Sequence, residues 1–451
     1  MLEKMFKLKE NNTSFRTEVV AGLTTFMAMA YILAVNPNIL SATGMNPDAI
    51  LLATALASFV GCMAMALLAN YPFALAPGMG LNAYMAFTVC GNMGYSWQIA
   101  LLAVFVEGLI FIVLSLTNVR EAIFNAIPMA LKKGVSAGIG LFIAFIGLQC
   151  SNLVVNDDST LLTYVKFVGD FHTIGIGALL ALIGLFIIVV LHHKNIKGSI
   201  LIGILATWIL GMICEAIGLY VPDGKDFYSL YPTFRMIDFG AFGTTFGQCF
   251  NVDFSGVDIL NFIAVLFAFL FVDIFDTLGT LIGVSTKANM LDEEGKLPRI
   301  RPALLADAIA TSVGAIFGTS TTTTYVESSA GVAAGGRTGL SAMVTGLLFL
   351  LAIVFAPIFT AIPSFATAPA LIFVGFLMIS SIISIDFEDI TEAVPAYLAM
   401  LAMPLMYSIS EGIALGVISY VVINLCCGKA KKIKPLMYIL TVLFVLKYIF
   451  L

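Results

Sequence analysis

The sequence predicts an all-α polytopic membrane protein with about fourteen transmembrane segments. Of its 451 residues, 60% are hydrophobic and only 11% are charged, and the mean hydropathy is +1.03. Soluble domains carry about 25% charged residues, so this chain lacks the polar surface that would cover a globule in water. Crossing a bilayer takes roughly 20 apolar residues per helix, and such windows recur along nearly the whole chain. We therefore expect the lipid bilayer, and no nucleic acid, as its surroundings.

The apolar windows are punctuated by glycine, proline and charged residues, which places the segment ends. The first half should contain segments at 17–40, 47–69, 74–90, 97–117, 134–151, 172–192 and 198–219. The second half should contain segments at 258–285, 302–318, 321–335, 338–360, 367–384, 394–409 and 411–427. The tail 436–451 is apolar but short, so it is either interfacial or a further crossing.

Positive charge sets the expected orientation, because Lys and Arg concentrate in cytoplasmic loops. Four basic residues precede the first segment: Lys4, Lys7, Lys9 and Arg16. Counting crossings from them, most of the remaining Lys and Arg fall on the same side. The loop 386–392 is acidic and breaks this pattern. We expect a multi-pass protein of the plasma membrane with a cytoplasmic amino terminus.

A faint internal repeat supports two related halves. Ala55–Gly61 is echoed by Ala308–Gly314, and Ile123–Pro128 is echoed by Ile358–Pro363, in the same order. Each match alone is weak, but together with the segment count they predict two halves of seven helices. Since seven is odd, the second half must be inverted in the membrane, which is a common plan for secondary transporters.

Two corresponding segments, the third and the tenth, are unsuited to an ordinary membrane helix. Pro72 and Pro77 interrupt the first of them, and six consecutive Ser and Thr residues at 319–324 occupy the second. Proline blocks a regular helix, and Ser and Thr can satisfy exposed backbone groups themselves. We expect extended runs leading into half-helices whose amino termini meet near the bilayer midplane and face a ligand. The alternative is a kinked helix and a small-residue packing face.

Carboxylates embedded in these segments are the strongest indication of a site. Asp273 and Asp276 are three residues apart in the eighth segment and share a helical face with Thr277 and Thr280. Each charge near the bilayer centre costs about 2.5–3.5 kcal/mol even on the lenient insertion scale. No Lys or Arg occurs within 258–285 to pair with them. Such residues, with Glu327 in the tenth segment as a third, are expected to face a cavity and bind something.

Other classes of function lack their signatures. The cysteines and histidines show no metal-ligand spacing, and no P-loop or dinucleotide fingerprint occurs, so we expect no metal, no cofactor and no enzyme. An ion channel, the alternative of a different class, should show repeats lining a pore axis. Broken helices with asymmetrically placed carboxylates favour a transporter instead.

Four motifs in order carry a resemblance to a known family. They are residues 16–22 (Arg-Thr-Glu-Val-Val-Ala-Gly) with 24–26, residues 74–83, residues 272–283, and residues 327–331 with 335–339. At these motifs, and nearly end to end, the sequence resembles the nucleobase:cation symporter-2 (nucleobase–ascorbate transporter) family. The particular likeness is to its AzgA-like branch of purine permeases, which take guanine, hypoxanthine and adenine.

The resemblance implies a fold of two inverted repeats that combine into a core domain and a gate domain. The core would comprise 17–117 and 258–360, and the gate 134–219 and 367–427, with a tail at 428–451. Transport would follow an elevator-like movement of the core against the gate, as symport with a cation, which in this family is mostly a proton.

The resemblance also implies roles for single residues. Asp273, Glu327 and Asn82 would contact the substrate, while Asp276, with Thr277 and Thr280, would serve coupling or support the site. A flat ring should stack on an aromatic side chain. Phe73 is our candidate, and Tyr84, Phe87 and Tyr325 remain alternatives.

The chemistry of purines is consistent with these carboxylates. Guanine and hypoxanthine present an N1–H donor, and an ionised Glu327 can accept from it and from the neighbouring amino group of guanine. Adenine lacks that donor and would need a protonated carboxyl. Rival substrates for the same fold are uracil, xanthine or an inorganic anion, and three acidic residues argue against an anion. The sequence leaves open the preferred purine, proton or sodium coupling, and whether the protein forms a homodimer.

Overall fold

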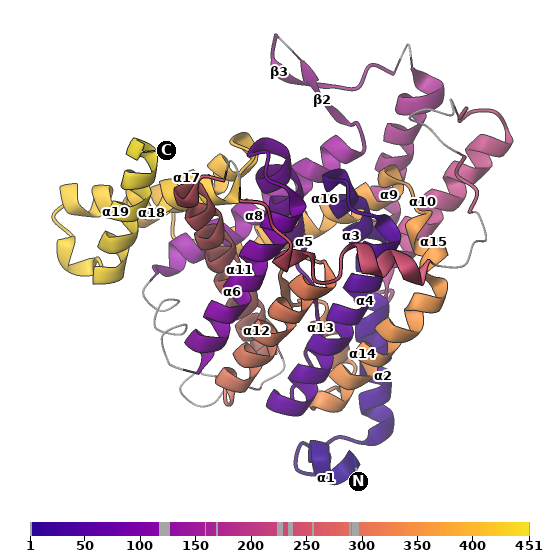
Figure 1. Ribbon diagram of the computed structural model, residues 1–451, viewed down its shortest axis with the longest axis horizontal. Coiled ribbons are helices and arrows are strands. Elements are labelled where there is room, and N and C mark those ends of the chain that lie inside the picture. The colour runs from indigo at the N-terminus through magenta and orange to yellow at the C-terminus, as the bar shows by residue number, and fades with distance from the viewer. Residues whose placement is uncertain are drawn as a thin grey trace.

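The computed structural model describes residues 2–116, 127–157, 159–167, 170–222, 229–232, 238–254, 257–287, 290 and 297–450. In this part of the chain the protein is predominantly helical, with four short strands (Figure 1). Nine of the described helices are long and apolar enough to cross a membrane, and several shorter apolar helices accompany them. The prediction of an all-α polytopic membrane protein is therefore confirmed.

The elements follow the predicted segments closely. The first half contains α1 (Leu2–Phe6), α2 (Phe15–Met29), α3 (Ile32–Leu40), α4 (Pro47–Ala64), β1 (Leu75–Pro77), α5 (Met79–Ala83), α6 (Trp97–Ser115), α8 (Met129–Cys150), β2 (Val154–Asp157), β3 (Leu161–Tyr164), α9 (Ile176–His193) and α10 (Ser199–Ala216). The second half contains α11 (Ile259–Lys287), α12 (Ile300–Phe317), β4 (Thr322–Thr324), α13 (Ser328–Ala333), α14 (Gly339–Ala352), α15 (Ala356–Thr360), α16 (Ser364–Ile379), α17 (Ile390–Leu405), α18 (Ile409–Cys426) and α19 (Pro435–Phe450). A π-helical stretch, η3 (Tyr84–Asn92), continues α5.

Polar residues at the helix starts explain where several segments begin. Asn46 caps α4 by accepting from two backbone N–H groups, Ser96 caps α6, and Ser408 caps α18. A side-chain oxygen at this position satisfies N–H groups that the helix itself leaves unpaired.

The second match of the internal repeat pairs Ile123–Pro128 with Ile358–Pro363, and Ile123–Pro128 lies largely outside the described residues.

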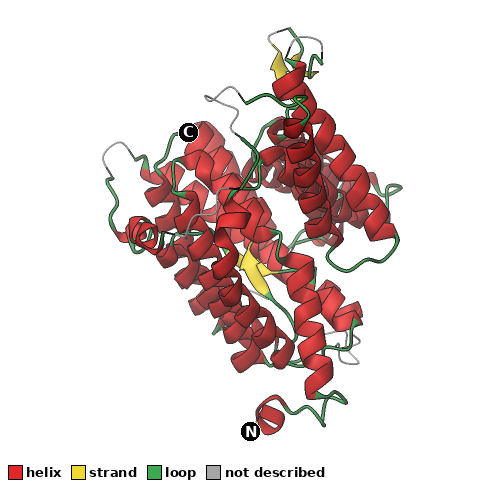
Figure 2. Ribbon diagram, turned by 90° about the vertical axis from the view of Figure 1, so that its right-hand side faces the viewer, coloured by secondary structure: helices red, strands yellow, loops and turns green. Residues whose placement is uncertain are grey.

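The two interrupted segments cross each other in the interior, as an antiparallel pair of strands (Figure 2). β1 pairs with β4 over three residues, and the pairing continues at each end. The Gly78 N–H donates to the Thr321 carbonyl at 2.9 Å, and the Tyr325 N–H donates to the Ala74 carbonyl at 3.0 Å. Away from water, backbone polar groups must be paired within the protein, and each extended run supplies the partners of the other. The expected extended runs leading into half-helices are thus present.

The internal repeat has a physical reason at this crossing. Gly61 on α4 and Gly314 on α12 end the two echoed stretches, and each faces a strand. A Cβ on Gly61 would lie 3.0 Å from the Leu75 Cβ, and one on Gly314 would lie 2.9 Å from the Thr322 Oγ1. Both contacts are tighter than ordinary packing allows. Each half of the chain therefore keeps a glycine where its own helix passes its own strand.

The helices pack in two groups around this centre. One group, built by α2, α3, α4, α6, α11, α12, α13 and α14, surrounds the crossing. The other is built by α8, α9, α10, α16, α17 and α18, and α8 packs closely on α16 because a Cβ on Gly140 would lie 2.7 Å from the Gly375 carbonyl oxygen. The two groups meet at several places: α11 contacts α8 and α18, α10 contacts α2, and α16 contacts α3. The short helix α5 contacts both α3 and α8. The β2–β3 hairpin lies at the opposite end of the molecule from α1 (Figure 1).

Candidate functional site

Glu327 lies where the second strand run turns into α13. It directly precedes Ser328, the first residue of that helix, and its side chain is half-buried, whereas the neighbouring Val326 is 52% exposed. The hydroxyl of Tyr31, a fully buried residue at the junction of α2 and α3, donates to Glu327 Oε1 at 2.6 Å. This bond joins the first segment to the tenth. Its donor, Tyr31, is a residue that the sequence analysis missed.

Asp276 is the second carboxylate at the crossing. Its Oδ2 lies 3.4 Å from the hydroxyl of Thr323, the central residue of β4, and its side chain is half-buried. A Cβ added at Gly78, just after β1, would lie 3.5 Å from the same oxygen. Asp276 therefore stands beside both strands.

Asp273 lies near a buried hydroxyl and another carboxylate instead of the two strands. The Thr277 Oγ1 lies 2.8 Å from Asp273 Oδ1 and 2.9 Å from Asp307 Oδ1, and all three residues are fully buried. A hydroxyl carries one proton, so it can donate to one carboxylate and accept from the other only when that other is protonated. The arrangement suits a carboxyl–carboxylate pair that shares a proton through Thr277. Thr280, one turn further along α11, is also buried.

Three consecutive residues before β4 are each fixed by a different helix of the first half. Asn36 on α3 donates to Thr319 Oγ1 at 3.0 Å, Ser320 donates to Asn82 Oδ1 on α5, and Thr321 donates to Glu107 Oε2 on α6 at 2.7 Å. All six side chains are fully buried. Among the described residues, the amide nitrogen of Asn82 has no hydrogen-bond partner, so a donor is available beside the crossing. Asn82 is the residue predicted to contact a ligand, and its contact remains a prediction.

The four aromatic candidates differ in how much ring surface they offer. Phe73 is fully buried and stacks on Tyr71 with 5.2 Å between centroids, and Tyr84 is buried against Phe269. Tyr325 is buried and its hydroxyl donates to the Pro77 carbonyl at 2.5 Å. Phe87 alone among the four is half-buried. The stacking role predicted for Phe73 would require a change in its packing, and it remains a prediction.

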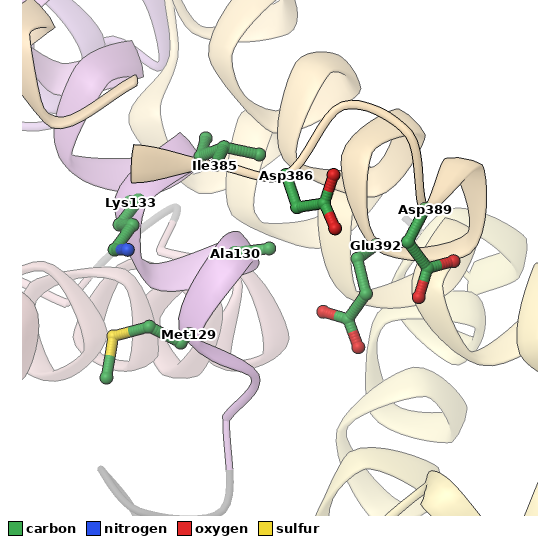
Figure 3. Close-up of a pocket in the computed structure, with 7 residues that line it drawn as sticks. All are labelled: Met129, Ala130, Lys133, Ile385, Asp386, Asp389 and Glu392. Carbon is green, nitrogen blue, oxygen red and sulfur yellow. The ribbon is translucent and has the colours of Figure 1, made fainter. Parts of the chain in front are cut away.

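A pocket of about 220 Å³ lies elsewhere, in the second group of helices (Figure 3). It is lined by Met129, Ala130, Lys133, Ile385, Asp386, Asp389 and Glu392. Asp389 pairs with Lys429 at 3.1 Å and with Lys432 at 3.3 Å, and Glu392 pairs with Lys432 at 2.7 Å. The Thr391 hydroxyl and then the Lys429 ammonium lower the pKa of Asp389 below its ordinary value. These pairs explain the acidic loop that broke the charge pattern, and the pocket contains none of the residues at the crossing.

Comparison with solved structures supports the architecture. The chain resembles the transmembrane domain of a cyanobacterium bicarbonate transporter, BicA, with a TM-score of 0.63 and 16% identity, over 89% of this chain and 97% of that one. At this identity the likeness shows the fold alone. That fold has two inverted repeats with core and gate domains, as the family resemblance implies.

Comparisons with protein sequences identify the family. The chain is 47% identical to the guanine/hypoxanthine permease PbuG of Bacillus subtilis (strain 168) over the full length of both chains. It is 41% identical to the adenine permease AdeP of Escherichia coli (strain K12), over 100% of this chain and 96% of that one. The family model Xan_ur_permease, described as the Permease family, matches residues 16–415. The protein therefore belongs to this permease family, the nucleobase:cation symporter-2 family that its motifs resemble.

Proposed function

We propose that the protein imports purine nucleobases, guanine and hypoxanthine in preference to adenine, together with a proton. The observation that carries the proposal is the pair of half-buried carboxylates, Glu327 and Asp276, at the crossing of β1 and β4. Two acceptor groups suit a ligand that presents several N–H donors. The names of the relatives support the same substrate class, since they include a guanine/hypoxanthine permease and an adenine permease.

The ligand is proposed to bind against Glu327 by its N1–H edge. Each carboxylate oxygen has two acceptor positions, so Oε1 can keep the Tyr31 hydroxyl and still accept from the ligand. The amide nitrogen of Asn82, which has no partner in the described part of the chain, can donate to a purine carbonyl or ring nitrogen. We assign the second carboxylate contact to Asp276 rather than Asp273, because Asp273 is fully buried against Thr277.

Proton coupling is proposed to use the carboxylates of the crossing. Asp276 is our first candidate for the carrier, with the Asp273–Thr277–Asp307 group as its buried neighbour. The group of helices around the crossing, 17–117 and 258–360, would move as a core against a gate formed by 134–219 and 367–427. The contacts of α5 and α11 with α8, of α11 with α18, of α10 with α2 and of α16 with α3 would then be among the surfaces that slide. We propose a plasma-membrane location with a cytoplasmic amino terminus, on the strength of the basic loops.

The proposal is tested by uptake of radiolabelled hypoxanthine, guanine, adenine and uracil in cells that lack their own nucleobase permeases. We expect saturable uptake of guanine and hypoxanthine that collapses when a proton uncoupler is added. Uptake that survives the uncoupler but depends on external sodium would replace the proton by sodium. Uptake of none of the four compounds would overturn the purine assignment, and bicarbonate and other anions would become the next substrates to test.

Tyr31→Phe is expected to weaken guanine binding by about tenfold, because one hydrogen bond to a charged group contributes about 1.5 kcal/mol. The change removes the hydroxyl that orients Glu327 and favours its ionised form. Adenine, which needs the protonated carboxyl, should lose less affinity than guanine. Competition against labelled hypoxanthine gives both inhibition constants.

The matched control for this change is Tyr231→Phe, which removes a hydroxyl bonded to the Met212 carbonyl, outside the crossing. It should leave both inhibition constants unchanged. If Tyr31→Phe bound guanine as tightly as the unchanged protein, the Tyr31–Glu327 bond would have no part in recognition.

A further inference from the structure

Two of the family motifs meet at a buried carboxylate that the proposed mechanism does not use. Glu18, in the first turn of α2, is fully buried. Its Oε1 accepts from the backbone N–H of Arg337 at 2.8 Å, and its Oε2 accepts from the N–H of Thr338 at 3.3 Å and from the Ser341 hydroxyl at 2.5 Å. Helix α14 begins just after Thr338. The carboxylate therefore caps α14 from another helix, where its negative charge is favourable.

The same turn fixes the end of α13. The Nη1 of Arg337 donates to the Val332 carbonyl at 2.8 Å and to the Gly336 carbonyl at 2.7 Å, which closes the C-terminal end of that helix. Along its length α13 lies directly on α2, because a Cβ on Gly331 would lie only 2.0 Å from Thr25 Oγ1. The same Cβ would lie 2.7 Å from the Ala21 carbonyl oxygen, so the backbones of the two helices are also close there. The turn 335–338 therefore sets the position of α13 along α2, and Glu18 holds this turn.

Helix α13 begins directly after Glu327. Helix α2 ends at Met29, two residues before Tyr31. The Tyr31–Glu327 bond therefore joins the C-terminal end of α2 to the N-terminal end of α13. Glu18 and the turn 335–338 lie at the opposite ends of these two helices. At 1.5 Å per residue, Glu18 lies about 20 Å from Tyr31 along the helix, so it is remote from a ligand at the crossing.

We propose that Glu18 is a positioning residue for the purine site. By holding the turn 335–338 it fixes α13 on α2, and so sets where the Glu327 carboxylate stands relative to the Tyr31 hydroxyl. The inference rests on the proposed function, because it concerns the geometry of that same site. It assigns a role to the motifs at 16–22 and 335–339, which lie away from the ligand.

The test is the dissociation constant of radiolabelled guanine for purified protein, measured with the melting temperature of the same samples. Glu18→Gln keeps the size of the side chain but turns one acceptor oxygen into a donor that faces N–H groups. We expect it to raise the dissociation constant about tenfold, since small displacements of a binding group have effects of this size or larger. Glu18→Asp, which keeps both oxygens, should recover most of the affinity.

Two further variants separate positioning from plain stability. Glu215→Gln is the matched control, because Glu215 on α10 also accepts from a serine hydroxyl and a backbone N–H, both at 2.7 Å. It should lower the melting temperature without changing guanine affinity. In a Tyr31→Phe background, Glu18→Gln should cost less than about threefold, because coupled residues are not additive. If Glu18→Gln is too unstable to purify, Ser341→Ala, which removes one donor to the same carboxylate, should weaken binding in the same direction by about threefold.

The outcomes are distinguishable. If Glu18→Gln lowers the melting temperature but its folded fraction binds guanine with the unchanged affinity, Glu18 is a structural cap and the positioning role is wrong. If the unchanged protein binds none of the purines, the proposed function itself is wrong. The positioning role of Glu18 is then wrong as well, because it depends on that function.

Discussion

Glu327→Gln is expected to weaken guanine binding about a hundredfold while leaving adenine binding unchanged or stronger. Guanine presents two adjacent donors, N1–H and the 2-amino group, to the two oxygens of the carboxylate. Glutamine keeps one acceptor and places an NH₂ donor against the second ligand donor. Losing a charge-assisted bond and leaving a donor unpaired costs about 3 kcal/mol, which is roughly a hundredfold in affinity. Adenine presents a ring acceptor beside its 6-amino donor, and that edge matches a side-chain amide.

The inversion of selectivity is a sharper readout than the loss alone. A variant that merely disturbed the fold would weaken guanine and adenine together. Inhibition constants for both purines should be measured in Glu327→Gln and in Glu327→Asp, which keeps the charge but draws it back by one methylene. We expect Glu327→Asp to weaken both purines and to keep their order. Equal losses of guanine and adenine in Glu327→Gln would remove Glu327 from the recognition of the N1 edge.

The segments of the fold could be predicted from sequence where composition alone decides the local structure. Two prolines at residues 72 and 77 and the Ser/Thr run at 319–324 disfavour a regular membrane helix. Proline alone is not decisive, because α3, α16 and α17 each contain it in their interior. The pairing of β1 with β4 could not be predicted in the same way. Strands of three residues are too short for a periodic pattern, and their register depends on contacts between the two halves of the chain.

The arrangement of the acidic residues in the folded protein could be predicted only in part. Residues three apart share a helix face but differ by about 60° in direction, since each residue turns the helix by about 100°. That difference is enough to direct Asp276 toward the strands and Asp273 toward Asp307. Residues four apart are closer in direction, which accounts for the bond from Thr277 to Asp273.

Asp307, Tyr31 and Glu18 were not among the site residues predicted from sequence, for two different reasons. Asp307 lies in an apolar segment and satisfies the same criterion that singled out Asp273, so the sequence did contain its signal. Tyr31 and Glu18 make their contacts with residues of the other half. A single tyrosine has no distinctive local pattern, and the motif at 16–22 that contains Glu18 does not indicate which residues it contacts. Their importance became visible only when the two halves were packed together.

Asp276→Asn is expected to abolish concentrative uptake of guanine while preserving exchange of labelled for unlabelled guanine. The exchange should need a higher guanine concentration, because asparagine keeps only one acceptor oxygen for the ligand. Asparagine has nearly the same shape and can still accept from the Thr323 hydroxyl, but it cannot carry a proton across the membrane. One proton moving with each ligand under 100 mV contributes about 2.3 kcal/mol, which supports roughly fiftyfold accumulation. The variant should therefore reach an internal-to-external ratio near one. Exchange persists because binding and movement of the loaded protein need no net proton transfer.

The measurement uses proteoliposomes with an imposed pH gradient and membrane potential, comparing net accumulation with counterflow in the same preparation. Asp386→Asn is the control, since Asp386 is exposed in the loop before α17, away from the crossing. It should retain both activities. Intact accumulation by Asp276→Asn would exclude Asp276 as the carrier. Asp307→Asn would then be the next variant to test, because Asp307 and Asp273 both contact the buried hydroxyl of Thr277.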